Sequence, residues 1–192
     1  MKQGKIAESV LKRSIFKQLH LKRPDVLLAA GIGEDCAAFA VAEDEVAVIS
    51  ADPVIWEDSL DGRCAVHANL NDLAAGGAEP VGLMLTALLP PEIEEAQMRQ
   101  MVQMIAQECE PLQVQILGGH TEVTDAVKHP VVSIAAVGKA KKGMLSTTTG
   151  AKPGDDIVVT KWIALEATAK LARSRREALL SRYPRHLLDD AE

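Results

Sequence analysis

The amino-acid sequence predicts an α/β protein, in a two-layer α+β arrangement whose mixed sheet carries helices on one face. Apolar runs of strand length alternate with longer Ala- and Leu-rich segments of helical spacing, in the order strand, helix, strand, helix, strand, strand. Hydrophobic residues make up 47% of the 192 residues, which is enough for a core, although aromatic residues are only 3%. A Val- and Ala-rich face left uncovered by helices is expected to need a partner.

The N-terminal segment predicts a helix followed by a hairpin and a buried strand. Residues 6–20 (IAESVLKRSIFKQLH) place apolar side chains at helical spacing, and Pro24 ends that segment. The strands expected next are DVLLAA, CAAFAV and VAVISAD, separated by the turns GIGED and AEDE. Because Pro53 lacks a backbone donor, the third strand is expected to stop there or to lie at a sheet edge.

The middle of the chain alternates helices and strands. An Ala-rich helix is predicted from Asp58 to Ala78, broken by Gly76-Gly77. VGLMLTALL (81–89) reads as a strand that stops at Pro90-Pro91, and a helix from about Glu92 to Cys109 follows. VQILGG and PVVSIAAVGKA are expected to be two more strands, joined by the loop HTEVTDAVKH.

A change of composition predicts a domain boundary. GMLSTTTGAKPGDD is polar and rich in Gly and Thr, so a linker is expected over residues 143–154. Residues 1–142 then form an N-terminal domain. Residues 155–192 supply one strand (DDIVVT) and one helix, which is only the start of a second domain.

Charge and cysteine usage restrict the partners and the compartment. A net charge of -6 argues against nucleic acid or an anionic membrane as the main partner. The sequence contains no signal-peptide pattern and no apolar run of the ~20 residues that span a membrane. Three cysteines without CxxC spacing suit a reducing cytoplasm. A cytoplasmic protein without a membrane segment is therefore expected.

Carboxylates occur beside a glycine turn and at a strand end. In GIGED, Gly33 permits a positive φ, and Glu34 and Asp35 are oxygen donors of the kind that Mg²⁺ prefers. An ordinary acidic hairpin turn is the alternative. Asp52 ends an apolar strand, where an acid commonly points into a site, although it could equally serve as a cap or turn residue.

Polar residues also occur on the Ala-rich helix and after a later strand. Asn69 and Asp72 are three residues apart and share a helix face, where they either bind a metal–phosphate group or face solvent. The motif GGHTE offers backbone N–H groups, a hydroxyl and further ligands. Its candidate residues are Gly118, Gly119, His120 and Thr121.

Together these segments resemble the superfamily of aminoimidazole ribonucleotide (AIR) synthetase, the PurM-like proteins. HypE, thiamine-monophosphate kinase and selenophosphate synthetase are other members. The resemblance rests on Gly4-Lys5, GIGEDCAA, the strand ending in AD, NLNDLAAGGAEP, GGHTE and KPGDDIVVTK, in that order. NLNDLAAGGAEP is the most specific of these motifs. GGHTEVT and TKWIALEATAKLA look most like the HypE-like, hydrogenase-maturation branch.

The resemblance implies a fold, a cofactor and a partner. In this family the N-terminal sheet pairs with that of a second subunit, so that a barrel forms across a homodimer, and ATP lies beside the interface with magnesium held by acids. The implied metal and phosphate ligands are Asp35, Asp52 and Asp72, with Glu34 as an addition and Asn69 as a neighbour. The implied second phosphate-side loop contains Gly118, Gly119 and Thr121, with His120 where several members carry an acid. Lys5 is similar in position to a mobile N-terminal basic residue of the family that could reach the terminal phosphate.

Three hypotheses about function follow. The first is a Mg-dependent ATP-binding domain that activates an amide- or carbonyl-type oxygen by phosphoryl transfer, with turnover only in the complete protein. Its acceptor, a small molecule or a protein-bound group, is left open. The second is a non-catalytic dimerisation or regulatory module derived from the same family. The third is that the 192 residues are part of a longer enzyme.

Overall fold

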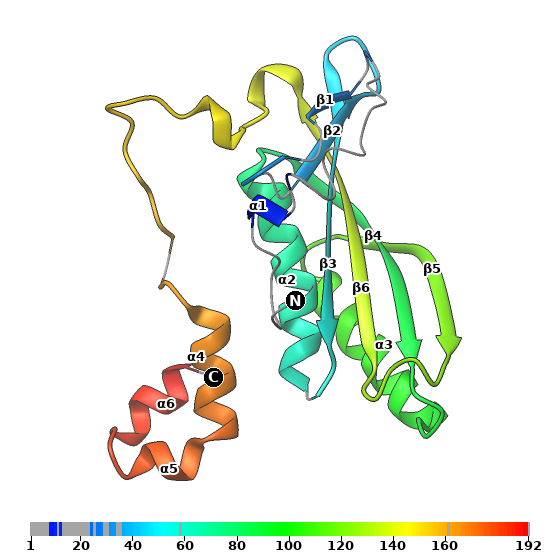
Figure 1. Cartoon of the computed structure of the whole chain (residues 1–192), viewed down its shortest axis with the longest axis vertical. Coiled ribbons are helices and arrows are strands. Elements are labelled where there is room, and N and C mark those ends of the chain that lie inside the picture. The colour runs from blue at the N-terminus through cyan, green and yellow to red at the C-terminus, as the bar shows by residue number, and fades with distance from the viewer. Residues whose placement is uncertain are drawn as a thin grey trace. The chain divides into compact units, whose positions relative to one another are not determined.

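The computed structural model describes residues 8–10, 12, 24, 26–28, 31–33, 36–57, 59–160 and 162–191. The chain forms two compact units, Met1–Ala151 (unit 1) and Lys152–Glu192 (unit 2), which are described separately (Figure 1). The linker expected over residues 143–154 straddles their boundary.

Unit 1 contains a six-stranded mixed sheet in the order β1-β2-β3-β6-β4-β5 (Figure 1). The strands are β1 (Val26–Leu28), β2 (Cys36–Ala40), β3 (Glu45–Ile55), β4 (Glu79–Leu89), β5 (Gln115–Val123) and β6 (Val131–Lys141). Only the pairing of β4 with β5 is parallel, while the other neighbours are antiparallel. Because β3 and β4 both run against β6, the strands β3, β4 and β5 share one direction. The mixed sheet predicted from the sequence is confirmed.

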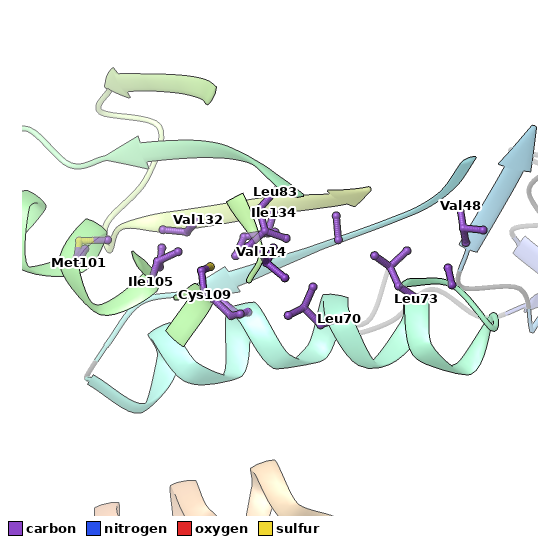
Figure 2. Close-up of a cluster of buried hydrophobic side chains, with 14 of the residues drawn as sticks. Val48, Leu70, Leu73, Leu83, Met101, Ile105, Cys109, Val114, Val132 and Ile134 are labelled. Atoms are coloured by element: carbon purple, nitrogen blue, oxygen red, sulfur yellow. The ribbon is translucent and has the colours of Figure 1, made fainter. Parts of the chain in front are cut away.

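Two helices cover one face of this sheet. These are α2 (Ser59–Ala75) and α3 (Glu95–Cys109), while α1 (Glu8–Val10) is the described part of the helix expected over residues 6–20, most of which lies outside the described residues. Figure 2 shows Leu70 and Leu73 of α2, and Met101 and Ile105 of α3, on the same side of the strands. Their buried partners on the strands include Val46, Val48, Leu83, Val132, Ile134 and Ala136. Alternate residues of β3 and β6 are buried, which is the period-two pattern of a sheet with one covered face.

The helix starts agree with the predictions to within a few residues. The backbone N–H of Glu94 donates to Oε1 of Gln97 at 2.9 Å, so α3 begins one turn later than the expected start near Glu92. The helix α2 ends where Gly76 and Gly77 were expected to break it, and Gly77 has a φ of +78°.

The other sheet face is lined by small and apolar side chains. The register places Ile49 of β3 opposite Val137 of β6, and Ala51 opposite Ala135. Met84 of β4 lies on the other side of Ala135 and is 43% exposed. Neither α2 nor α3 covers these residues, so this surface, here called the open face, has the Val- and Ala-rich character expected from the sequence.

The strand β3 continues past Pro53. It pairs with β6 as far as Ile55, whereas the described part of its ladder with β2 reaches the pair Cys36–Ser50, and Gly33, which would lie opposite Pro53 in that register, is in a turn. At Pro53 the strand therefore has one recorded neighbour, so the edge alternative predicted from the sequence is the correct one.

The GGHTE motif is not a turn, and the prediction of a loop from His120 onward is wrong. Gly118 and Gly119 lie inside β5, which pairs with β4 as far as Val123. Both glycines have positive φ, at +147° and +148°, beside a register shift at Leu83 and Met84. A Cβ on Gly119 would lie 1.8 Å from the carbonyl oxygen of Leu85. Because they lack a Cβ, the two glycines allow β5 to stay paired with β4 through this irregularity. A glycine pair is equally typical of a turn, so the sequence pattern alone did not distinguish the two.

Ion pairs hold the turn between β2 and β3 against the end of β6. Nζ of Lys141 lies 2.9 Å from Asp44 and 3.1 Å from Glu45. The hydrogen bond from Lys141 lowers the pKa of Asp44, and the hydrogen bonds to Asp44 and Glu45 raise the pKa of Lys141. The next residue, Lys142, donates its backbone N–H to the carbonyl oxygen of Asp44 at 3.0 Å. The chain is thus anchored where it leaves the sheet.

The described residues of unit 2 form the helices α4 (Leu165–Ser174), α5 (Arg176–Leu180) and α6 (Arg185–Ala191). Ala169, Ala172 and Leu188 are its buried apolar residues. The strand expected at DDIVVT is not formed: Ile157 and Val158 are 95% and 82% exposed. A strand needs a neighbour for its backbone, and no strand is described in unit 2. The single helix expected after Lys161 is divided at Arg175.

No helix in the described part of the chain combines the length and the apolar character needed to cross a membrane.

Candidate functional site

The structure brings three of the predicted site residues together between β3 and α2. Ser50 and Asp52 alternate onto the helix-covered face of β3, and Asn69 and Asp72 lie three residues apart on α2. Oγ of Ser50 donates to Oδ2 of Asp72 at 2.6 Å. The backbone N–H of Asp52 donates to Oδ1 of Asn69 at 3.1 Å. We call these four residues the α2–β3 cluster.

Asn69 joins the helix to the strand from a fully buried position. Its Nδ2 donates to the carbonyl oxygen of Ala65 at 2.9 Å, while its Oδ1 accepts from Asp52. The amide oxygen of Asn69 thus supplies an acceptor for the backbone N–H of Asp52, just beyond the described part of the ladder between β2 and β3. Both polar atoms of the Asn69 side chain therefore form hydrogen bonds with the backbone. Asn69 thus holds α2 and β3 together and has a positioning role in the cluster.

The two carboxylates of the cluster differ in environment. Asp52 is exposed and Asp72 is half-buried. Oxygen donors of this kind fit a hard divalent cation that also keeps phosphate oxygens and waters as ligands. Within the described residues, no three His, Cys, Asp or Glu side chains gather closely enough to hold a metal. Three of the predicted site residues, Lys5, Glu34 and Asp35, lie outside the described residues.

The glycine turn is described as far as Gly33, which has a φ of +76°, a positive value that glycine permits. The carbonyl oxygen of Gly33 accepts a hydrogen bond from Oγ1 of Thr148 at 2.7 Å. The turn is thereby tied to a segment 115 residues further along the chain.

The predicted residues of β5 face two sides of the sheet. His120 pairs with Thr86 on the open face, and its Nε2 lies 3.5 Å from Oε2 of Glu122. Thr121 faces α3 and lines an apolar pocket of about 380 Å³ with residues such as Leu89. Two strands, β6 and β4, separate β5 from β3, which corresponds to a lateral distance of about 14 Å. Within one chain, the β5 residues are therefore separate from the α2–β3 cluster.

A larger cleft of about 620 Å³ lies where β3 and β4 end, next to the first turns of α3. Trp56, Met104 and Lys128 are among its lining residues, and none of the predicted site residues is. A Cβ on Gly62 would lie 2.7 Å from the Trp56 ring, so the glycine makes room for the indole against α2.

Sequence reasoning missed two residues that shape the site. Ser50 precedes Asp52 by two positions in a strand, and strand alternation alone would have placed both side chains on one face. Thr148 lies in a segment that the sequence predicted to be a linker. No local pattern signals its contact with Gly33, because the two residues meet only through the fold.

Comparisons with known proteins give the family. The chain matches the model of the AIR synthase related protein, N-terminal domain, over residues 33–140, which is more than half of its length. It is 33% identical over 154 residues to thiamine-monophosphate kinase of Escherichia coli K12, covering 76% of this chain and 45% of the relative. It is 30% identical over 154 residues to carbamoyl dehydratase HypE of Cupriavidus necator, covering 77% and 43%. The chain spans less than half the length of both relatives.

Solved structures show the same fold. The structure described as AaThiL complexed with AMPPCP and TMP matches with a TM-score of 0.69 at 18% identity, covering 95% of this chain and 57% of that chain. The hydrogenase maturation protein HypE in complex with ATP matches with a TM-score of 0.53 at 18% identity, covering 79% and 45%. Sequence and fold agree, and the chain belongs to the family of AIR synthase related proteins through its N-terminal domain.

Proposed function

We propose that unit 1 binds ATP together with Mg²⁺ at the α2–β3 cluster and the glycine turn. The α2–β3 cluster carries this proposal, because hydrogen bonds to the buried residues Ser50 and Asn69 tie Asp72 and the backbone of Asp52 to one place between helix and strand, in a family with ATP-bound relatives. Asp52 and Asp72 would hold the metal, with Glu34 and Asp35 as further candidate ligands. Gly33, Gly118, Gly119, His120 and Thr121 are the proposed nucleotide-side residues.

The proposed chemistry is phosphoryl transfer to an amide- or carbonyl-type oxygen. Mg²⁺, when bound, neutralises charge on the β- and γ-phosphates. Backbone N–H groups of the glycine turn would orient the phosphates, and Lys5 would assist transfer to the acceptor. Two relatives are named as kinases, thiamine-monophosphate kinase and selenide, water dikinase. Since the chain spans less than half of these relatives, turnover is proposed for the complete protein.

Calorimetric titration with ATP, with and without Mg²⁺, tests this function. The chain is expected to bind ATP only with the metal, and Asp72→Asn is expected to weaken binding at least about tenfold because one anionic ligand is lost. Asp125→Asn removes the same charge from an exposed loop and should leave the affinity unchanged. Equal affinity with and without Mg²⁺, or no binding by a folded chain, would contradict the proposal.

We also propose that the open face pairs with a second copy of the chain. An identical apolar surface on each copy can form a two-fold interface. Ala135→Asp places a carboxylate at the centre of the open face and is expected to weaken the dimer at least about tenfold. Ala106→Asp, on the exposed side of α3, is the matched control.

Light scattering coupled to size-exclusion chromatography measures this effect. A dimeric wild type and control with a monomeric Ala135→Asp variant are the expected result. A wild-type chain that stays monomeric at high concentration would exclude the pairing.

The alternative function is a non-catalytic module that keeps the paired sheet without turning over ATP. The open face favours it, because that surface needs no nucleotide. A dimer that shows no Mg-dependent ATP binding would support this alternative over the enzyme.

A further inference from the structure

A segment that follows β6, Met144–Gly150, crosses the glycine turns of unit 1, and we call it the strap. The backbone N–H of Ser146 donates to the carbonyl oxygen of Gly76 at 3.1 Å. Oγ1 of Thr148 donates to the carbonyl oxygen of Gly33 at 2.7 Å. The strap therefore contacts the end of α2 and the first glycine turn within three residues of chain.

Close packing fixes the strap to the end of α2 and to the hydrophobic core of unit 1. The φ of Gly77 is +78°, and a Cβ there would lie 2.3 Å from the carbonyl oxygen of Met144. Leu145 packs against the hydrophobic core. The strap is closed on itself by a hydrogen bond of 3.0 Å from the N–H of Gly150 to the carbonyl oxygen of Thr147. The position of Thr148 is thus set by backbone contacts on both sides.

The strap contacts both parts of the proposed nucleotide site: Ser146 bonds to Gly76 beside the α2–β3 cluster, and Thr148 bonds to Gly33 in the glycine turn. The N–H of Gly76 donates to the carbonyl oxygen of Asp72 at 2.9 Å, so the strap is one hydrogen bond away from a cluster residue. Gly33 immediately precedes Glu34 and Asp35 in the chain. No other hydrogen bond recorded among the described residues joins Gly33 to a side chain.

We propose that Thr148 is a positioning residue for the nucleotide site. Its hydroxyl holds the carbonyl of Gly33 and so fixes the glycine turn relative to the end of α2. Glycine can adopt many backbone conformations, so a glycine turn that is free to move loses conformational entropy when a ligand binds. A turn that is already held in place before binding does not lose this entropy, and the affinity is higher. The inference rests on the proposed function of the same site. Thr148 acts through Gly33, so it is assigned no contact with the nucleotide.

The test compares Thr148→Val, which removes the hydroxyl at nearly constant shape, with Thr148→Ser, which keeps it. Thr149→Val is the matched control, because this exposed neighbour bonds only to Thr147 among the recorded contacts. Hydrogen exchange is measured first, without nucleotide. Thr148→Val should exchange faster in residues 31–40, while β6 keeps its wild-type protection. The serine and control variants should match the wild type.

Calorimetric titration with Mg-ATP is the second readout. A three- to tenfold weaker affinity is expected for Thr148→Val, with recovery in Thr148→Ser, which corresponds to about 0.7–1.4 kcal/mol. Unchanged exchange at residues 31–40, or faster exchange throughout β6 as well, would overturn the positioning role. A wild-type chain that binds no Mg-ATP would overturn the proposed function instead, and the exchange data would still show whether Thr148 holds the turn.

Discussion

Replacing Gly119 by alanine is expected to destabilise unit 1 by at least about 3 kcal/mol. The added Cβ would lie 1.8 Å from the carbonyl oxygen of Leu85 and 2.8 Å from its nitrogen, so the parallel pairing of β5 with β4 cannot persist unchanged. A φ of +148° adds backbone strain for any residue with a side chain. Urea denaturation followed by circular dichroism measures the loss.

Two other glycines separate the causes of this effect. Gly118 has a φ of +147°, but its nearest neighbour to an added Cβ, Sδ of Met84, is 4.0 Å away. Gly118→Ala should therefore lower the stability only through backbone strain, by about 1–2 kcal/mol. Gly143 has open space around it, so Gly143→Ala should be close to neutral. Equal stability of Gly119→Ala and Gly143→Ala would show that β5 does not pair with β4 in this register.

Replacing Asn69 by alanine is expected to cost about 2–3 kcal/mol of stability and to abolish most of the proposed Mg-ATP binding. The substitution removes the acceptor of the Asp52 N–H and leaves a void at a fully buried position. The substitution keeps both carboxylates of the cluster. It removes the hydrogen bond between Asn69 and the backbone N–H of Asp52, which fixes the position of Asp52 relative to α2. Thermal unfolding and nucleotide titration of the same sample measure the two effects.

Asn71→Ala is the matched control, since Asn71 is an exposed residue on the same helix. It should be neutral or slightly stabilising because alanine has the higher helix propensity. A variant of Asn69 that is destabilised yet binds Mg-ATP like the wild type would show that the α2–β3 cluster is structural and that the nucleotide binds elsewhere.

Local periodicity was sufficient to predict most of the elements of unit 1. VAVISAD and VGLMLTALL became β3 and β4 because long apolar runs between turn residues have few other stable arrangements. The same reasoning failed at Gly118-Gly119, because a glycine pair signals a turn and a strand irregularity equally well. It also failed at Ile157–Val159, where β-branched residues favour a strand but no neighbouring strand is described to pair with them.

The candidate site shows a similar division. The spacing of Asn69 and Asp72 predicted a shared helix face, which the hydrogen bonds to Ser50 and Asp52 confirm. The sequence could not predict that β6 and β4 lie between β3 and β5, because strand order depends on long-range pairing. The contact of Thr148 with Gly33 could not be predicted either, because a hydrogen bond between distant segments leaves no local sequence pattern.

The pairing of β3 with β6 also bears on how the protein is made. β3 ends at Ile55, and the long strand beside it begins only at Val131. At about 5–20 residues per second, a ribosome needs several seconds to synthesise the intervening chain, and during that time the nascent β3 has only the short β2 as a neighbour. Closure of the sheet therefore waits until Lys141 has emerged from the exit tunnel. Until then an apolar strand edge is open to chaperones or to other nascent chains.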